Sequence, residues 1–139
     1  MANIVKVGMA DLNVCKSSDG VTTLGLGSCV GVCIPYPIAK VGGLVHAMLP
    51  DSTQIENNTN RFKFADTGIE DLVKKLVAMG GNKSRFEAKL AGGAKMFAFQ
   101  NYFLKGLLKL PFFLFKNFQK NSEHLLTFLH KLCIYSIYS

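Results

Sequence analysis

The clearest hydrophobic pattern in the chain is a pair of apolar segments separated by a short turn. Small and β-branched residues alternate over Cys29–Ile34, which is typical of a β-strand. Two prolines in Pro35–Ala39 favour a turn, because proline lacks the N–H that a central strand needs. Val41–Leu49 is apolar again and predicts the returning strand. The pattern therefore predicts a β-hairpin.

The predicted hairpin brings a thiol and an imidazole together. If the turn is centred between Pro37 and Ile38, Cys29 lies directly opposite His46. Opposed residues of an antiparallel pair share a face, with Cβ atoms about 4.5–5.5 Å apart. A slip of one residue would place the two side chains on opposite faces. The register is thus a hypothesis that the structure can test.

The remaining segments predict one helix and several short strands. Apolar residues suggest strands over residues 4–7 and 11–14, with a turn at residues 16–20. The polar segment 51–63 predicts a surface loop next to His46, in which Asp51 and Ser52 either contact a substrate or form a plain turn. Residues 85–90 alternate as in a strand, and Ala91–Ala94 bends the chain away.

The helix has clear signals at both ends. Thr67 and Glu70 fit a capping box with Thr67 as N-cap. Apolar residues then recur at helical spacing: Ile69, Leu72, Val73, Leu76 and Val77. Gly80 and Gly81 predict its C-terminal end.

Composition limits the function classes. The chain of 139 residues has a net charge of +7, of which residues 100–139 carry five basic groups and one acidic group. Because the excess is concentrated in the C-terminal part and no nucleic-acid-binding motif accompanies it, we expect no nucleic-acid partner. No segment reads as membrane-spanning or as a signal peptide. Four cysteines without an export signal favour a cytoplasmic protein with reduced thiols.

The composition changes near residue 98. Phe, Leu and Lys dominate residues 98–139, and helix caps, turn residues and alternation are lost. One hypothesis is that this tail is translated out of frame after a deletion in the gene. The alternative is an amphipathic tail that packs on the core or on a partner. We therefore expect two units, a domain over residues 1–97 and an anomalous tail over residues 98–139.

Candidate chemistry centres on the glycine-rich segment Thr22–Ile34. Cys29 follows a loop with room for a ligand, so it is either a candidate nucleophile or a small core residue. His46 is either its base or a satisfied core histidine. The N–H groups of Gly27, Ser28 and Cys29 are candidate oxyanion donors, and a turn role for Ser28 fits better than a second nucleophile.

A metal site is disfavoured by the residues available. Cys29, Cys33 and His46 would need a fourth zinc ligand, and the sequence offers no convincing one. Cys33 shares a strand face with Cys29 but lies towards the turn, where core packing is expected. We expect no metal and no other cofactor.

Four blocks of the sequence, in order and at natural spacing, carry a family resemblance. They are Thr23–Cys33, His46–Ser52, Phe64–Thr67 and Glu87–Phe97. With these blocks, residues 1–97 resemble the CheD family of chemoreceptor glutamine deamidases. The resemblance implies a layered α/β sandwich with a mostly antiparallel sheet. It also implies hydrolysis of glutamine side-chain amides on methyl-accepting chemotaxis proteins.

The resemblance further assigns roles to single residues and a partner. It implies a catalytic cysteine at Cys29, a histidine at His46 and a supporting threonine at Thr23, although Thr23 by itself would equally close the loop onto backbone. It also implies regulation by a CheC-type chemotaxis phosphatase that occupies the site.

The C-terminal part departs from the family pattern. The further strands and second glycine-rich segment of the family are not found after Phe97. We therefore expect a C-terminally incomplete fold, with an open sheet edge. The alternative function is a non-catalytic or defunct copy that at most binds the receptor or the phosphatase.

Overall fold

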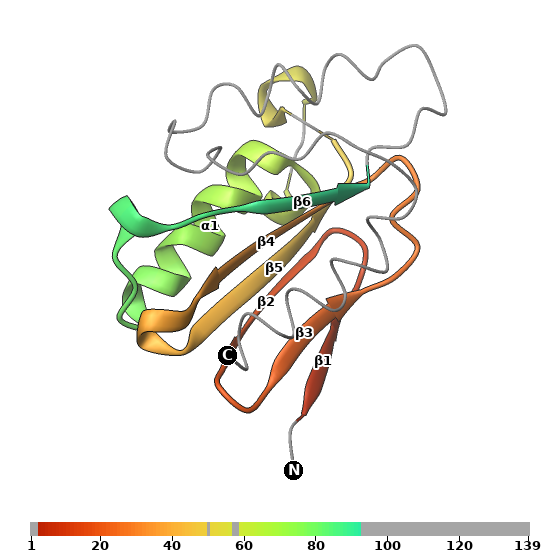
Figure 1. The fold of residues 1–139 in the computed structure, drawn as a ribbon. Helices are drawn as coiled ribbons and strands as arrows, with labels where there is room; N and C mark the ends of the chain where they lie inside the picture. Colours follow the sequence, from red (N-terminus) through yellow and green to blue (C-terminus); the bar gives the residue numbers. More distant parts are fainter. Residues whose placement is uncertain (1–2, 50, 57–58, 93–139) are drawn as a thin grey trace.

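The computed structural model describes residues 3–49, 51–56 and 59–92, which form six strands and one α-helix (Figure 1). The strands are β1 (Ile4–Val7), β2 (Asp11–Lys16), β3 (Gly20–Thr23), β4 (Val30–Tyr36), β5 (Val41–Ala47) and β6 (Lys89–Gly92). The helix α1 spans Ala65–Ala78. Short 3-10 turns lie at Pro37–Ala39, Ser52–Gln54, Arg61–Lys63 and Lys83–Arg85. The predicted tail, 98–139, and the predicted incomplete C-terminal part lie outside the described residues.

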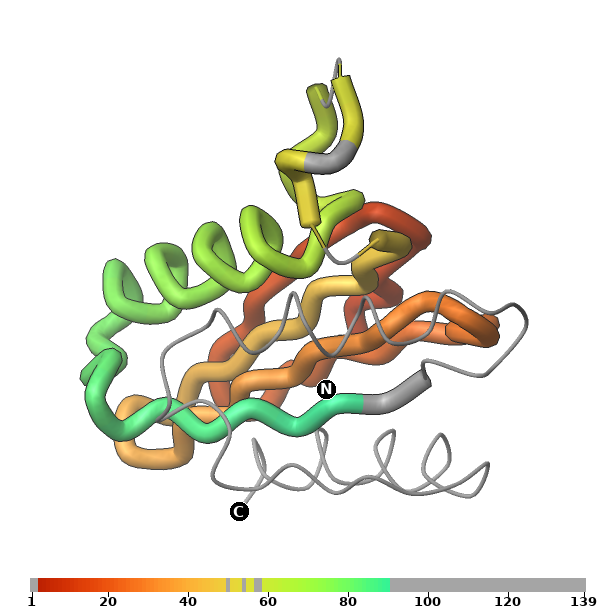
Figure 2. Tube along the Cα trace, turned by 90° about the horizontal axis from the view of Figure 1, so that it is seen from above, coloured from red at the N-terminus to blue at the C-terminus, as the bar shows by residue number. Residues whose placement is uncertain are grey.

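These elements form three layers. A four-stranded antiparallel sheet has the order β2-β5-β4-β6, and β1 pairs with β3 in a separate parallel sheet. Figure 2 shows α1 to one side of the strands and running along them. Even-numbered residues of β4 pack towards α1, whereas Cys33 and Leu44 pack against Val7 and Val21 of the β1–β3 pair. The predicted α/β class with a mostly antiparallel sheet is confirmed.

The predicted hairpin exists, but the predicted register is wrong by two residues. Gly31, not Cys29, pairs with His46, and Tyr36 pairs with Val41. The chain reverses at Pro37–Ala39 and Lys40, which has the left-handed φ of 54°. The reversal is therefore one residue later than expected. The register differs from the prediction by two residues, an even number, so Cys29 lies at the same strand parity as Gly31. A shift of two residues, unlike a shift of one, does not move Cys29 to the face opposite His46.

Pro35 explains why the reversal is late. This residue was expected in the turn, but it lies within β4 and pairs with Gly42. The other neighbour of β4 is β6, which pairs with β4 only as far as Cys33. Beyond Cys33, one side of β4 has no ladder partner among the described residues. A proline there removes no hydrogen bond from the sheet.

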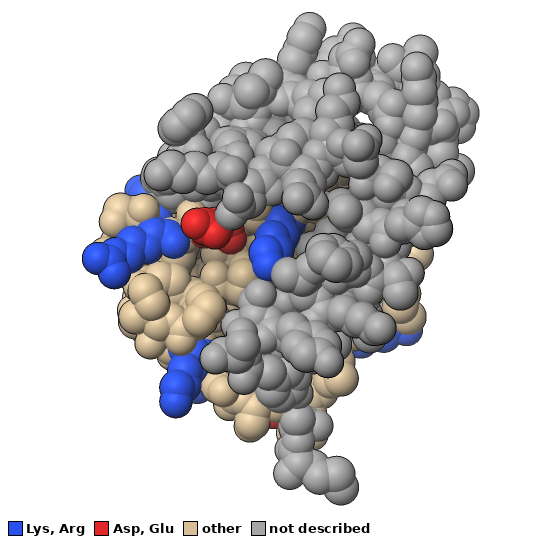
Figure 3. All heavy atoms as spheres, in the orientation of Figure 1, with Lys and Arg blue, Asp and Glu red and all other residues tan. Residues whose placement is uncertain are grey.

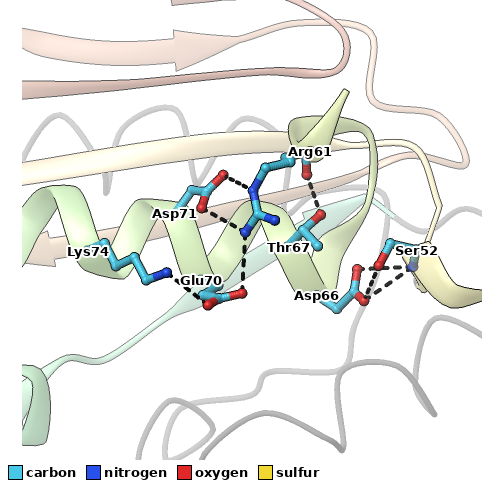
Figure 4. A network of polar contacts seen from close by, with 7 residues as sticks. All are labelled: Ser52, Arg61, Asp66, Thr67, Glu70, Asp71 and Lys74. Atoms are coloured by element: carbon cyan, nitrogen blue, oxygen red, sulfur yellow. Dashed lines mark hydrogen bonds and ion pairs between the residues drawn. The ribbon is translucent and has the colours of Figure 1, made fainter. Parts of the chain in front are cut away.

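The helix begins three residues earlier than the capping box predicted. Its N-cap is Phe64, which has no side-chain capping bond. Phe64 forms a bridge with Leu49, and the Ala65 N–H donates to the Leu49 carbonyl. The start of α1 is therefore set by a contact with the segment after β5. Thr67 lies inside the first turn and donates its hydroxyl to the Arg61 carbonyl (Figure 4).

The C-terminal end of α1 is as predicted. Gly80 has a φ of 101°, which only glycine adopts without strain. The Gly80 N–H donates to the Val77 carbonyl and the Gly81 N–H donates to the Leu76 carbonyl. This pair of bonds is a Schellman motif and satisfies two carbonyls at the helix end.

The short strands follow the prediction less closely. β1 has the predicted bounds, and β2 continues two residues further than expected, to Lys16. β3 was not predicted as a strand, because Gly20 was assigned to the preceding turn, and Thr22 and Thr23 to the glycine-rich segment that reads as a loop. β6 begins at Lys89, after a 3-10 turn in place of the predicted strand start at Arg85.

Candidate functional site

His46 lies at the centre of the candidate site. It is on β5, on the face that packs towards β1 and β3, and only 1% of its surface is exposed. Its Nδ1 lies 2.8 Å from Oγ1 of Thr23, at the end of β3. The same Thr23 hydroxyl donates to the Val7 carbonyl at 2.8 Å. The structure therefore brings two of the sequence-predicted residues into direct contact.

These two bonds fix the position of the imidazole proton. A threonine hydroxyl has one hydrogen, and Val7 receives it. In its contact with His46, Thr23 must then be the acceptor, so Nδ1 carries the proton. In a neutral imidazole, Nε2 is left with a lone pair. Nε2 is buried and has no hydrogen-bond partner among the described residues. A buried base with a free lone pair is the expected state of a proton acceptor.

Cys29 lies immediately before β4, two residues from Gly31, the pairing partner of His46. It is buried and packs with Leu26 and with Met48, which is two residues beyond His46. This places Cys29 at a diagonal rather than a directly opposed position relative to His46. Diagonal neighbours have separations of about 7–8 Å, within which long or mobile side chains meet.

The loop before Cys29 is a tight turn. The Cys29 N–H donates to the Leu26 carbonyl at 2.7 Å, which closes a four-residue turn. Gly27 has a φ of 52° at its first central position and Ser28 does not have a positive φ, as in a type II′ turn. The Cys29 N–H is therefore occupied and is not a free oxyanion donor. Within the described residues, the N–H groups of Gly27 and Ser28 donate no hydrogen bond.

Gly31 gives the site its space. A Cβ at this position would lie 3.3 Å from both methyl carbons of Leu26 and 3.7 Å from Cγ2 of Thr23. A side chain opposite His46 would thus push on the loop that carries Cys29. The sequence suggested room for a ligand near the glycine-rich loop, but it did not single out Gly31, because that inference needs the register.

Burial keeps both reactive groups uncharged. It raises the pKa of the Cys29 thiol and lowers the pKa of the His46 imidazole. At neutral pH the resting pair is therefore a thiol beside a neutral imidazole, not a thiolate–imidazolium pair.

The other candidates fall outside this arrangement. Cys33 is buried in the cluster with Val7 and Leu44, as its strand position predicted. Asp51 is buried and accepts hydrogen bonds from the N–H and hydroxyl of Thr53, while Ser52 donates to the Asp66 carboxylate (Figure 4). Within residues 3–49, 51–56 and 59–92, no three His, Cys, Asp or Glu residues gather in a way that could hold a metal ion.

Sequence reasoning missed two contributors to the site. The Val7 carbonyl accepts the hydrogen bond of the Thr23 hydroxyl, and Asp11 on β2 is the pairing partner of His46 on the neighbouring strand β5. Neither has a local signal, because each is brought to the site by strand pairing over long sequence separations.

In the view of Figure 3, the visible Lys and Arg side chains of the described residues are separated by other residues. No helix in this part of the chain is long and apolar enough to cross a membrane.

A thiol, a histidine with a free Nε2 and a hydroxyl that orients the histidine are the parts that nucleophilic hydrolysis by cysteine requires. The family model described as CheD chemotactic sensory transduction matches residues 48–107. The chain belongs to the CheD family.

Curated relatives support the same family. A protein of Lachnoclostridium phytofermentans named "Probable chemoreceptor glutamine deamidase CheD" is 59% identical over 101 residues, covering 73% of this chain and 63% of the relative. Proteins of the same name from Caldanaerobacter subterraneus and Clostridium botulinum are 56% and 50% identical, over 70% and 73% of this chain and 60% and 63% of their own lengths. The chain thus spans about three fifths of the length of these relatives.

Proposed function

We propose that this protein is a chemoreceptor glutamine deamidase, which hydrolyses glutamine side-chain amides of methyl-accepting chemotaxis proteins to glutamate and ammonia. The observation that carries the proposal is the hydrogen-bond chain from Val7 through Thr23 to His46, which leaves Nε2 as a buried base. The names of the relatives indicate the substrate class.

The first half of the proposed reaction forms a thioester. Nε2 of His46 accepts the thiol proton of Cys29 as the sulfur attacks the amide carbon. The carbonyl oxygen becomes an oxyanion, for which the N–H groups of Gly27 and Ser28 are the candidate donors. The imidazolium then gives its proton to the amide nitrogen, the carbon–nitrogen bond breaks, and ammonia leaves.

The second half regenerates the enzyme. Water attacks the thioester and gives a proton to Nε2 of His46, which is neutral again. The carbon–sulfur bond breaks, the thiolate of Cys29 takes the proton back, and the product is a glutamate side chain. Thr23 keeps Nδ1 protonated throughout, so Nε2 is the nitrogen that accepts and gives protons in both halves. No metal or other cofactor takes part in this scheme.

The partner part of the proposal is a CheC-type chemotaxis phosphatase that occupies the same site. We place the reaction in the cytoplasm, where the signalling parts of chemoreceptors lie.

The test is ammonia release from receptor fragments that contain glutamine at the modification sites. Cys29→Ala should abolish release and keep the fold, whereas Cys15→Ala should keep the activity, because Cys15 is a buried thiol whose pKa is raised to about 11 by burial and by Asp19. Equal release by the Cys29 variant and the parent would disprove the assigned nucleophile. Receptor binding without turnover by the parent would instead support a non-catalytic binding module.

A further inference from the structure

One carboxylate near His46 has no part in the scheme above. Asp11 on β2 is the direct pairing partner of His46 on β5. The other residues of β2 show which way each face of the strand points. Leu12 packs towards α1, and Cys15 packs towards β1 and β3. Asp11 has the parity of Cys15, so it shares the face of His46. In the described part of the chain, the side chains of Asp11 and His46 bond to other groups and not to each other.

Asp11 instead contacts the peptide group that anchors Thr23. Its Oδ2 accepts the Gly8 N–H at 3.3 Å, while Oδ1 accepts the Leu12 N–H at 2.8 Å. The Gly8 N–H and the Val7 carbonyl belong to one peptide unit. In a trans peptide these two groups point in opposite directions, and this peptide is trans. The Val7–Gly8 peptide therefore has Asp11 on one side and Thr23 on the other.

The bonds form one continuous chain in a single direction. His46 Nδ1–H donates to Thr23, Thr23 donates to the Val7 carbonyl, and the N–H of the same peptide donates to Asp11. Hydrogen bonds in such a chain polarise one another, and a charged acceptor strengthens the bond that it receives. Negative charge at Asp11 increases the electron density on the Val7 carbonyl and so strengthens its bond to Thr23.

We propose that Asp11 is a positioning residue for His46, acting through the Val7–Gly8 peptide and Thr23 to hold the imidazole with its proton on Nδ1. In many hydrolases a carboxylate contacts the histidine directly. Here the contact passes through a peptide and a hydroxyl, so the charge stays away from the buried ring. The inference rests on the proposed function for its kinetic readout, but its structural readout needs no turnover.

The test compares Asp11→Asn and Asp11→Ala with the parent chain. Asparagine keeps an acceptor for the Gly8 N–H without the charge, and alanine removes the acceptor. Ring ¹⁵N NMR of His46 reports which nitrogen carries the proton. We expect the Nδ1–H form in the parent, a mixture of tautomers in the alanine variant and an intermediate mixture in the asparagine variant.

On receptor fragments, kcat should fall about tenfold in the alanine variant, the effect of one lost hydrogen bond. It should fall about threefold in the asparagine variant, because neutral bonds have roughly half the strength of charge-assisted ones. KM should not change, since the proposed role of Asp11 is to position His46 and not to bind substrate.

The matched control is Asp19→Asn. Asp19 accepts the Asn3 N–H at 2.9 Å at the other end of β1, so it makes the same kind of bond away from the site. This variant should keep the tautomer and the kcat of the parent. The proposal fails if His46 carries its proton on Nε2 in the parent or if the Asp11 variants keep the parent tautomer. It also fails if Asp19→Asn loses as much kcat and as much of the Nδ1–H tautomer as the Asp11 variants. If the parent has no turnover but the tautomers shift as expected, the proposed function fails and the role of Asp11 stands.

Discussion

Thr23→Val offers the sharpest test of the site, because it removes one hydroxyl and keeps the shape of the side chain. The variant loses both 2.8 Å bonds, to the Val7 carbonyl and to Nδ1 of His46. Since His46 is 1% exposed, water cannot easily replace Thr23 as the acceptor. A buried polar group left without a partner costs about 1–3 kcal/mol, which should appear as a loss of that size in the free energy of unfolding.

The catalytic effect should be of similar size to the effect on stability. Without Thr23, His46 can shift its proton to Nε2, and this tautomer cannot accept the thiol proton of Cys29. A loss of about 1.4–2.8 kcal/mol in transition-state stabilisation lowers kcat about 10- to 100-fold. The assay is ammonia release under saturating receptor fragment, with urea unfolding of the same samples. Thr23→Ser keeps the hydroxyl and should retain most of the activity.

Thr22→Val is the matched control for this test. The Thr22 hydroxyl oxygen is buried and has no partner among the described residues, so its removal should leave stability unchanged or raise it by up to about 1 kcal/mol. The activity should stay at the parent level. If Thr23→Val keeps full activity, or if the two valine variants behave alike, the assigned role of Thr23 is wrong.

Two further predictions concern pH and packing. Burial lowers the pKa of His46 from 6.5. As pH falls, kcat/KM should therefore stay level through 6.5 and decline only below it. A decline in kcat/KM centred above pH 6.5 would contradict a buried base. Between the folded and unfolded pKa values of His46, the unfolded chain binds more protons than the folded chain. The contribution of neutral His46 to the free energy of unfolding should therefore be fully present above pH 6.5 and lost as pH falls through the folded pKa. Urea unfolding at a series of pH values measures it. Gly43→Ala would place a Cβ 2.5 Å from Cδ1 of Leu72 on α1, which should cost about 1–3 kcal/mol in unfolding free energy while the folded fraction keeps the His46 tautomer of the parent. An unchanged urea midpoint for this variant would show that α1 does not pack as closely on β5 as described.

The sequence predicted the hairpin and the helix end because local signals determine both. Alternation marks the two strands, and Gly80 is required where the chain adopts a positive φ. The register was missed because it depends on Pro35. That residue is unfavourable in a central strand but harmless where β6 does not extend. This exception depends on a strand more than fifty residues away in sequence, which no local pattern reports.

The start of α1 shows the same limit. Thr67 and Glu70 satisfy the capping pattern, yet Phe64 begins the helix because it bridges to Leu49. Glu70 instead bonds to Lys74 and Arg61, at the exposed surface (Figure 4). A tertiary contact at a helix start outweighs a capping preference of about 1 kcal/mol.

Motifs in the sequence predicted candidate site residues, but they did not predict how those residues are connected. Cys29, His46 and Thr23 were recognised from motifs, and the structure places Thr23 on His46. Asp11 and Gly31 were not predicted, because each matters only through its pairing with His46. Residues that position a site through strand pairing have no spacing rule in the sequence.

The uncharged resting state of the site has a consequence for the lifetime of the protein. Peroxides and other oxidants attack the thiolate form of cysteine, and susceptibility follows thiolate character and exposure. Cys29 is 8% exposed and its pKa is raised by burial, so little of it is thiolate at neutral pH. Under the proposed function, a nucleophile that ionises only during turnover resists oxidative inactivation while no substrate is bound.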